Sequence, residues 1–170
     1  MARAHFVKKA RKDHPEGGIK KGDSYWWWAF MVGGRGGPKH YSKTQPKASQ
    51  LTQSEYLGSI ADIQDELNAL GADDGLQSAV EDIASRIREL GEEQQSKKDN
   101  LPDSLQESET GQLLEERAQA CESAADELEA IEFDYTPNDD DDASDDDKAD
   151  AEQTHWDEKL AEVQGRGNLE

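Results

Sequence analysis

Apolar residues recur at two different periods along this chain, and the change of period separates a strand-like beginning from a helical remainder. Positions 25–32 read YWWWAFMV, an unbroken run of aromatic and aliphatic residues of the types that strands favour. The segment GGRGGP follows, and its glycines and proline favour a turn. A second alternating stretch covers residues 39–44. The pattern predicts an aromatic β-hairpin and a linker within residues 24–50.

Both faces of the first predicted strand are apolar. Side chains alternate between the faces of a strand, which places Tyr25, Trp27, Ala29 and Met31 on one face and Trp26, Trp28, Phe30 and Val32 on the other. A hairpin alone is only marginally stable in water. We therefore expect at least one of its faces to pack on a helix.

From residue 51 onward the apolar spacing changes to alternating fours and threes, the pattern of packed helices. The first stripe consists of Tyr56, Ile60, Ile63, Leu67 and Leu70, and the second of Leu76, Val80, Ile83, Ile87 and Leu90. Glycines at 71 and 91 follow the two stripes and predict the helix ends. The short connection over residues 71–75 favours an antiparallel helical hairpin.

A third, weaker stripe predicts a helix over about residues 111–132. Its members are Leu114, Arg117, Cys121, Ala124, Leu128 and Ile131. The polar stretch before it, residues 92–110, predicts a loop with a short turn around 104–107. Residues 51–133 are thus expected to form the helical hairpin plus a third helix. The heptad spacing suits an intrachain bundle and a homodimer equally.

Charge divides the chain at the same place as the hydrophobic period. The 170 residues carry a net charge of −20. The first 50 residues hold 11 Lys and Arg against 3 Asp and Glu, a net +8, which leaves −28 for the rest. Residues 1–23 contain much of this positive charge, and Pro15 and the pair Gly17-Gly18 interrupt any helix there. We expect this segment to be a flexible basic arm.

An acidic tail, residues 134–170, ends the sequence. Runs of aspartate at 139–142 and 145–147 repel themselves and predict disorder. Residues 148–163 predict a short amphipathic helix with Trp156, Leu160 and Val163 on one side. This helix either docks a partner or folds back onto the helical hairpin. The predicted fold class is α+β, mostly α, with the aromatic hairpin packed on a small antiparallel bundle or coiled-coil hairpin.

Residues with catalytic or metal-binding potential are few and scattered. Cys121 is the only cysteine, and the histidines at 5, 14, 40 and 155 show no metal-ligand spacing such as HExxH. Neither a phosphate-binding GxxxxGK[ST] loop nor an EF-hand pattern is present. We predict no enzyme, cofactor or metal site. The longest apolar run, residues 26–32, is much shorter than the ~20 residues of a membrane helix, so we expect no membrane partner.

The aromatic hairpin and the basic arm together point to nucleic acid. Six of the 11 aromatic residues fall within positions 25–41, beside lysines and an arginine. Aromatic rings stack on bases while cations neutralise phosphates. The alternative is that the tryptophans form the core. The candidate binding residues are Lys8, Lys9, Arg11, Lys12, Lys20, Lys21, Trp26, Trp28, Arg35, Lys39, Tyr41 and Lys43.

Two stretches resemble a group of uncharacterised bacteriophage proteins. The first is ARAHFVKKARKD, continuing through KKGDSYWWWAF and YSKTQPKASQLTQSEYL, and the second is LPDSLQESETGQLLEERAQACESAADELEAI. The resemblance implies a phage origin and a role in the host cytoplasm, and it brings no activity or functional residues.

Two functions are consistent with this sequence. The first is a phage accessory protein that binds DNA or RNA, single-stranded or without sequence specificity, and whose acidic tail modulates that binding. The alternative is an interaction protein that inhibits or redirects a host factor through an acidic, nucleic-acid-like surface. A host or phage protein partner would bind through the acidic tail and Trp156.

Overall fold

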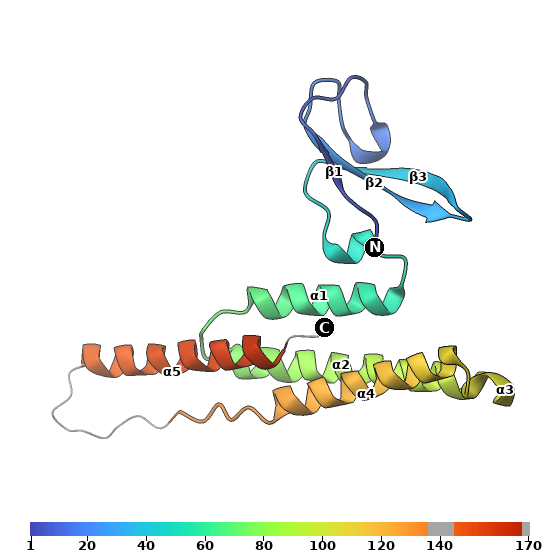
Figure 1. Cartoon of the computed structure of the whole chain (residues 1–170). Helices are drawn as coiled ribbons and strands as arrows, with labels where there is room; N and C mark the ends of the chain where they lie inside the picture. Colours follow the sequence, from blue (N-terminus) through green and yellow to red (C-terminus); the bar gives the residue numbers. More distant parts are fainter. Residues whose placement is uncertain (136–144, 168–170) are drawn as a thin grey trace. The chain divides into compact units, whose positions relative to one another are not determined.

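The computed structural model describes residues 1–135 and 145–167, which belong to two units with their boundary inside a helix. The sheet unit, residues 1–62, contains β1 (His5–Val7), η1 (Pro15–Gly17), β2 (Tyr25–Val32), β3 (Arg35–Ser42) and η2 (Ala48–Leu51) (Figure 1). Helix α1 (Glu55–Ala69) crosses the boundary. The helical unit, from residue 63, contains α2 (Leu76–Asp99), α3 (Asp103–Gln106), α4 (Glu109–Glu129) and α5 (Asp145–Arg166). The predicted class, α+β and mostly α, is confirmed.

The sheet has the antiparallel order β1-β2-β3, with β2 in the middle. The predicted hairpin is formed by β2 and β3, but its turn is tighter than expected. Gly33 and Gly34 have φ values of 56° and 78°, and a two-residue turn with both φ angles positive matches the twist of a hairpin. Strand β3 therefore begins at Arg35, and an irregularity opposite Ala29–Met31 accommodates Pro38.

Residues 1–23 do not form the flexible arm that the sequence predicted. Residues 5–7 pair with β2 as β1, and Ala10 and Ile19 are buried with 2% and 1% of their surface exposed. The Ala10 N–H donates to the Asp23 carbonyl at 2.8 Å, and the Gly22 N–H donates to the Ala10 carbonyl at 3.0 Å. Residues 5–7 form a strand because the backbone groups on the second edge of β2 need hydrogen-bond partners. A strand of only three residues supplies them.

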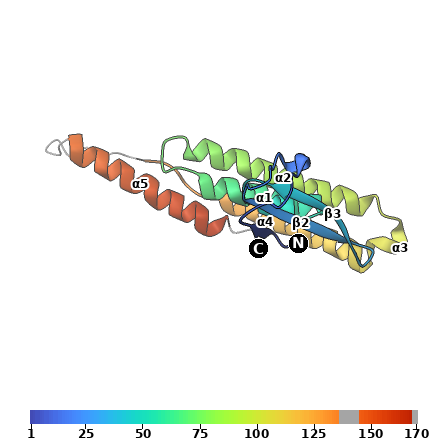
Figure 2. The ribbon, with the colours of Figure 1, turned by 90° about the horizontal axis from the view of Figure 1, so that it is seen from above.

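In the helical unit α2 packs antiparallel along α4 (Figures 1 and 2). Arg88 pairs with Asp126 and Glu129 at 3.0 and 2.8 Å, and ten residues further along α2, Lys98 pairs with Glu115 at 3.0 Å. These contacts show the antiparallel register of the two helices. The sequence predicted a helical hairpin of α2 with the preceding helix and did not identify α4 as its main partner. Helix α1 meets α2 through an ion pair between Glu66 and Arg86.

Gly91 lies inside α2, where the sequence predicted a helix end. A Cβ atom at this position would stand 2.9 Å from the Cβ of Cys121 and 3.2 Å from the carbonyl oxygen of Ala118. The glycine thus permits close approach of α4 and does not terminate α2, which continues to Asp99. The predicted loop over 92–110 shrinks accordingly, and α3 occupies the position of the expected turn. The third predicted helix is confirmed as α4.

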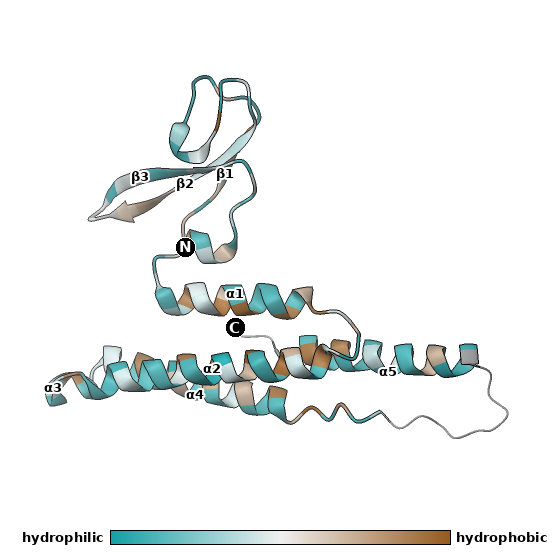
Figure 3. Cartoon of the chain, turned by 180° about the vertical axis from the view of Figure 1, so that it is seen from behind, coloured by the Kyte–Doolittle hydropathy of each residue, from teal (hydrophilic) through white to brown (hydrophobic). Residues whose placement is uncertain are grey.

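Helix α5 includes the amphipathic helix predicted over residues 148–163, and it folds back within the helical unit. Val163 is completely buried, the His155 ring nitrogen Nε2 lies 3.4 Å from the Phe133 carbonyl oxygen, and Arg166 donates to the Glu127 carbonyl at 3.4 Å. Of the expected disordered tract, residues 145–150 are helical, and 136–144 lie outside the described residues. Hydrophobic positions on these helices form stripes between hydrophilic surfaces (Figure 3).

Candidate nucleic-acid interface

The segment between β1 and β2, residues 8–23, lies against one face of the sheet, and we call it the basic loop. Its buried residues Ala10 and Ile19 form a small core with Tyr25, against which Val7, Trp27 and Tyr41 pack. Residues 14 and 19 pair through two backbone hydrogen bonds of 2.8 and 3.1 Å that close the tip of the loop. The loop is therefore held by apolar burial at positions 10 and 19, with the lysines and arginine of 8–12 left exposed.

A glycine allows the tip of the basic loop to touch β3 directly. A Cβ atom at Gly17 would stand 2.8 Å from the Tyr41 carbonyl oxygen and 2.9 Å from the Tyr41 Cβ. Both are shorter than a normal contact, and the carbonyl cannot rotate away. The next residue, Gly18, has a φ of 64°, in the region that glycine adopts most readily. These two glycines fix where the loop sits on the sheet.

Loop and sheet line an open pocket of about 450 Å³, which we call the basic aromatic pocket. The sheet contributes Val7, Tyr25, Trp27, Lys39 and Tyr41, and the loop contributes Lys9, Arg11, Lys12 and His14. The volume falls in the ordinary range for small-molecule sites, about 300–1,000 Å³. Four cationic side chains and three tyrosine or tryptophan rings therefore meet at one place.

The rings of the pocket are ordered by their neighbours. His14 stacks on Tyr41, with ring centroids 4.2 Å apart and planes 24° from parallel, and His5 stacks on Trp27 at 4.6 Å. The Lys39 ammonium lies 4.4 Å from the centroid of the Trp27 ring. An exposed cation–π contact of this kind contributes only about 0.5–1 kcal/mol. The contact of the exposed Lys39 side chain with Trp27 is therefore weak.

Positive charge in the pocket is not neutralised by neighbouring carboxylates. Within residues 1–135 and 145–167 neither Lys9, Arg11 nor Lys12 forms an ion pair. Two carboxylates of the basic loop have other partners. Asp13 accepts the backbone N–H of Lys21 at 2.6 Å. The carboxylate of Asp23 accepts the backbone N–H of Lys20 and pairs with Lys43 at 3.4 Å, and these contacts lower its pKa.

The structure brings together five of the predicted binding residues: Lys9, Arg11, Lys12, Lys39 and Tyr41 line the pocket. Lys8, Lys20, Lys21 and Arg35 are exposed outside it, and Lys43 is paired with Asp23. Trp26 and Trp28 lie on the opposite face of the sheet. Trp26 contacts Phe6, with ring centroids 5.1 Å apart.

The sequence predicted Trp28 as a binding residue, whereas the structure buries its side chain. Only 6% of Trp28 is exposed, and its ring stacks on His40 with a centroid distance of 5.5 Å. The residues that sequence reasoning missed are His14, Tyr25 and Trp27. Strand alternation already placed Tyr25 and Trp27 on one face, but nothing in the pattern showed which face the basic loop covers. His14 carries no sequence signal.

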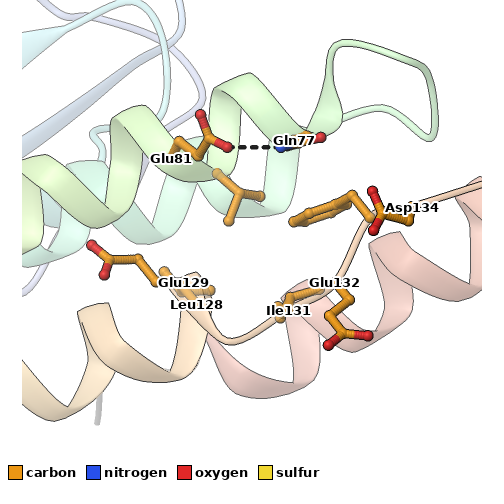
Figure 4. A pocket seen from close by; sticks show the side chains of 9 residues that line it. Gln77, Glu81, Leu128, Glu129, Ile131, Glu132 and Asp134 are labelled. Atoms are coloured by element: carbon orange, nitrogen blue, oxygen red, sulfur yellow. Dashed lines mark hydrogen bonds between the residues drawn. The ribbon is translucent and has the colours of Figure 1, made fainter.

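A second hollow, of about 300 Å³, lies in the helical unit between the first turns of α2 and the chain that follows α4. Gln77 and Glu81 line it from α2, and Leu128 and Ile131 line it from the other side (Figure 4); Gln77 donates to Glu81 at 2.8 Å. Glu129, Glu132 and Asp134 are its other carboxylates, and no Lys or Arg is among the described residues that line it. The two units thus present hollows of opposite charge.

Other kinds of site find no support in the described ranges. No three His, Cys, Asp or Glu side chains there are placed to hold a metal ion. Cys121 is buried with 1% exposed. Among the described helices, none combines the length and apolar character that spanning a bilayer requires. Searches of protein-family models, curated proteins and solved structures give no match to this chain.

Proposed function

We propose that the sheet unit binds single-stranded nucleic acid without sequence specificity, through the basic aromatic pocket. The observation that carries this proposal is the meeting of four cations with the partly exposed rings of Trp27 and Tyr41 in one pocket, which the buried Tyr25 also lines. Bases that are free of a duplex expose their π-faces and stack on such rings, while Lys and Arg neutralise the backbone. A duplex hides the same faces, so single strands are favoured.

The electrostatic part of the proposal is tested by the salt dependence of binding. If three to four phosphates are neutralised, the logarithm of the binding constant falls with the logarithm of salt concentration at a slope of about −2 to −3. We expect the triple variant Lys9→Ala/Arg11→Ala/Lys12→Ala to weaken binding of a fluorescein-labelled oligothymidylate and to flatten this slope. The matched control is Lys20→Ala/Lys21→Ala/Arg35→Ala, which removes the same charge outside the pocket.

The aromatic part is tested by two tryptophans on opposite faces of β2. Trp27→Ala is expected to weaken oligonucleotide binding by about 1–3 kcal/mol, the contribution of one stacked base. Trp26→Ala removes a ring of the same size from the face opposite the pocket and should leave affinity unchanged. Fluorescence anisotropy at low salt, about 50 mM, measures both. Equal losses in the two variants, or no binding by the unmodified protein, would contradict the proposal.

The acidic remainder of the chain is proposed to modulate this binding. Residues 63–170 carry 8 Lys and Arg against 34 Asp and Glu, a net −26, and this charge competes with phosphate for the pocket. Replacing Asp139–Asp142 by Asn removes four of these charges outside α5, and we expect it to tighten oligonucleotide binding at low salt and not at high salt. From the phage resemblance, we propose that this binding takes place in the host cytoplasm.

A second candidate function rests on the ion pairs of the helical unit. Six of its Lys and Arg side chains are paired with carboxylates of the same unit: Arg86, Arg88, Lys97, Lys98, Lys159 and Arg166. Its remaining surface is therefore strongly acidic and resembles nucleic acid in charge. A host protein recovered in stoichiometric amount from nuclease-treated lysate, and displaced by added duplex DNA, favours inhibition of a host factor.

A further inference from the structure

We infer that the basic aromatic pocket takes one nucleotide that bears a terminal phosphomonoester: the phosphorylated end of a single strand, or a free nucleotide of the same chemistry. The inference rests on the proposed function and makes it more specific, because it separates end binding from binding along a strand. It follows from the charge, the size and the ring contacts of the pocket, taken in that order.

Charge favours a dianion. Lys9, Arg11 and Lys12, which form no ion pair among the described residues, fall within four consecutive positions of the basic loop and line the pocket from one side. No Asp or Glu is among the described residues that line it. An internal phosphodiester carries a single negative charge, whereas a phosphomonoester carries about −1.5 to −2 at pH 7. Only the terminal group offers a charge that matches several cations at one phosphate.

Size favours one nucleotide. The pocket of about 450 Å³ lies between the basic loop and the sheet, and Gly17 brings the tip of the loop against the Tyr41 backbone. The loop is held there by the burial of Ile19 and by its backbone pairing with residue 14. A running strand needs a groove with repeated stacking positions. In this protein the rings instead lie in a single pocket on one face of the sheet, which suits one nucleotide.

The ring contacts show how base and phosphate can be held together. Lys39 covers the Trp27 ring at 4.4 Å from its centroid. A base that stacks on Trp27 replaces the ammonium there, and the freed Lys39 side chain becomes a fourth cation for the phosphate. Because the cation–π contact that is lost is weak, the exchange opposes binding only slightly. Lys39 therefore links stacking to charge neutralisation.

The test compares decathymidylates that differ only at the 5′ end: hydroxyl, phosphate, and phosphate methyl ester. The ester keeps nearly the size of the phosphate and removes its second charge. We expect the phosphate end to bind at least about tenfold more tightly than either of the others, and a 3′-phosphate series to show whether the other end is also accepted. The Lys9→Ala/Arg11→Ala/Lys12→Ala variant should bind all the oligonucleotides alike.

Competition against the 5′-phosphorylated oligonucleotide separates the sources of the ligand. Thymidine monophosphate should displace it, and thymidine or inorganic phosphate alone should do so far less effectively. Equal affinity for hydroxyl and phosphate ends would overturn the inference and leave the proposed function standing. Displacement by inorganic phosphate as effective as that by the nucleotide would overturn it in favour of a bare phosphate site. Absence of binding to every oligonucleotide would refute the proposed function itself.

Discussion

Gly91 gives the sharpest test of how α2 and α4 pack. In an exposed helix interior, replacing glycine by alanine stabilises a protein by about 1 kcal/mol. At Gly91 the new Cβ atom would stand 2.9 Å from the Cβ of Cys121 and 3.2 Å from the Ala118 carbonyl oxygen, whereas carbon atoms in contact prefer about 3.5–4.0 Å. Both neighbouring atoms are fixed to the α4 backbone, so the helices themselves must separate.

The magnitude follows from these two opposing effects. Overpacking a well-filled interior costs about 1–3 kcal/mol, so Gly91→Ala is expected to range from no change to a loss of about 2 kcal/mol. Gly165 in α5 is the matched control, because nothing lies within 4 Å of the place that a Cβ atom would take there. Gly165→Ala should gain up to about 1 kcal/mol. The two variants should thus differ by about 1–3 kcal/mol in the same unit.

Urea denaturation followed by far-ultraviolet circular dichroism measures the free energy of unfolding for both variants. Leucine has nearly the helix propensity of alanine, so any further loss in Gly91→Leu reports steric overlap alone, and we expect that loss. If Gly91→Ala stabilises the protein as much as Gly165→Ala, the two helices do not approach closely at this point.

Three other side chains give further expectations. Gln94 is 1% exposed and its Nε2 has no partner among the described residues, so Gln94→Met should raise unfolding stability by about 1 kcal/mol; a loss would indicate a hidden partner. Val163→Ala removes two buried methyl groups and should lower stability by about 2 kcal/mol, with faster amide exchange across α5 than in α4. Contacts with Lys20 and Lys43 lower the pKa of Asp23 from 3.8. The ionised Asp23 carboxylate therefore stabilises the fold fully above the pKa that it has in the unfolded chain. This stabilisation is lost as pH falls through the lower pKa that Asp23 has in the folded protein. In Asp23→Asn, acid unfolding monitored by tryptophan fluorescence should lack the loss of stability that protonation of Asp23 causes. Identical acid-unfolding curves for the variant and the unmodified protein would contradict this role of Asp23.

The helical stripes were predictable because their period is local. Ile63 and Leu67 in α1, and Val80, Ile83 and Ile87 in α2, were all placed on apolar faces by spacing alone, and all are buried. Strand alternation likewise separated the two faces of β2 correctly. The candidate pocket was only partly predictable. Its lysines and its arginine could be named from charge, but most of the rings beside them could not.

Long-range partners were not predictable from the same pattern. An apolar stripe shows that a face is covered, but hydrophobic burial is non-directional and does not say by which element. The main partner of α2 is α4, and the two helices approach closely at Gly91. The same glycine, taken alone in the sequence, is a normal stop signal for a helix, which explains why the helix end was misplaced.

By itself, the sequence determined the hairpin, the helices with their apolar faces, and the division of charge between a basic beginning and an acidic remainder. Those properties depend on local period and composition. Only the tertiary structure decided that residues 5–7 complete a sheet, that Trp28 is core, and that the basic loop lies on the face of Tyr25 and Trp27. The physical reason is that strand edges, buried rings and a pocket between two segments arise from contacts between residues far apart in the chain.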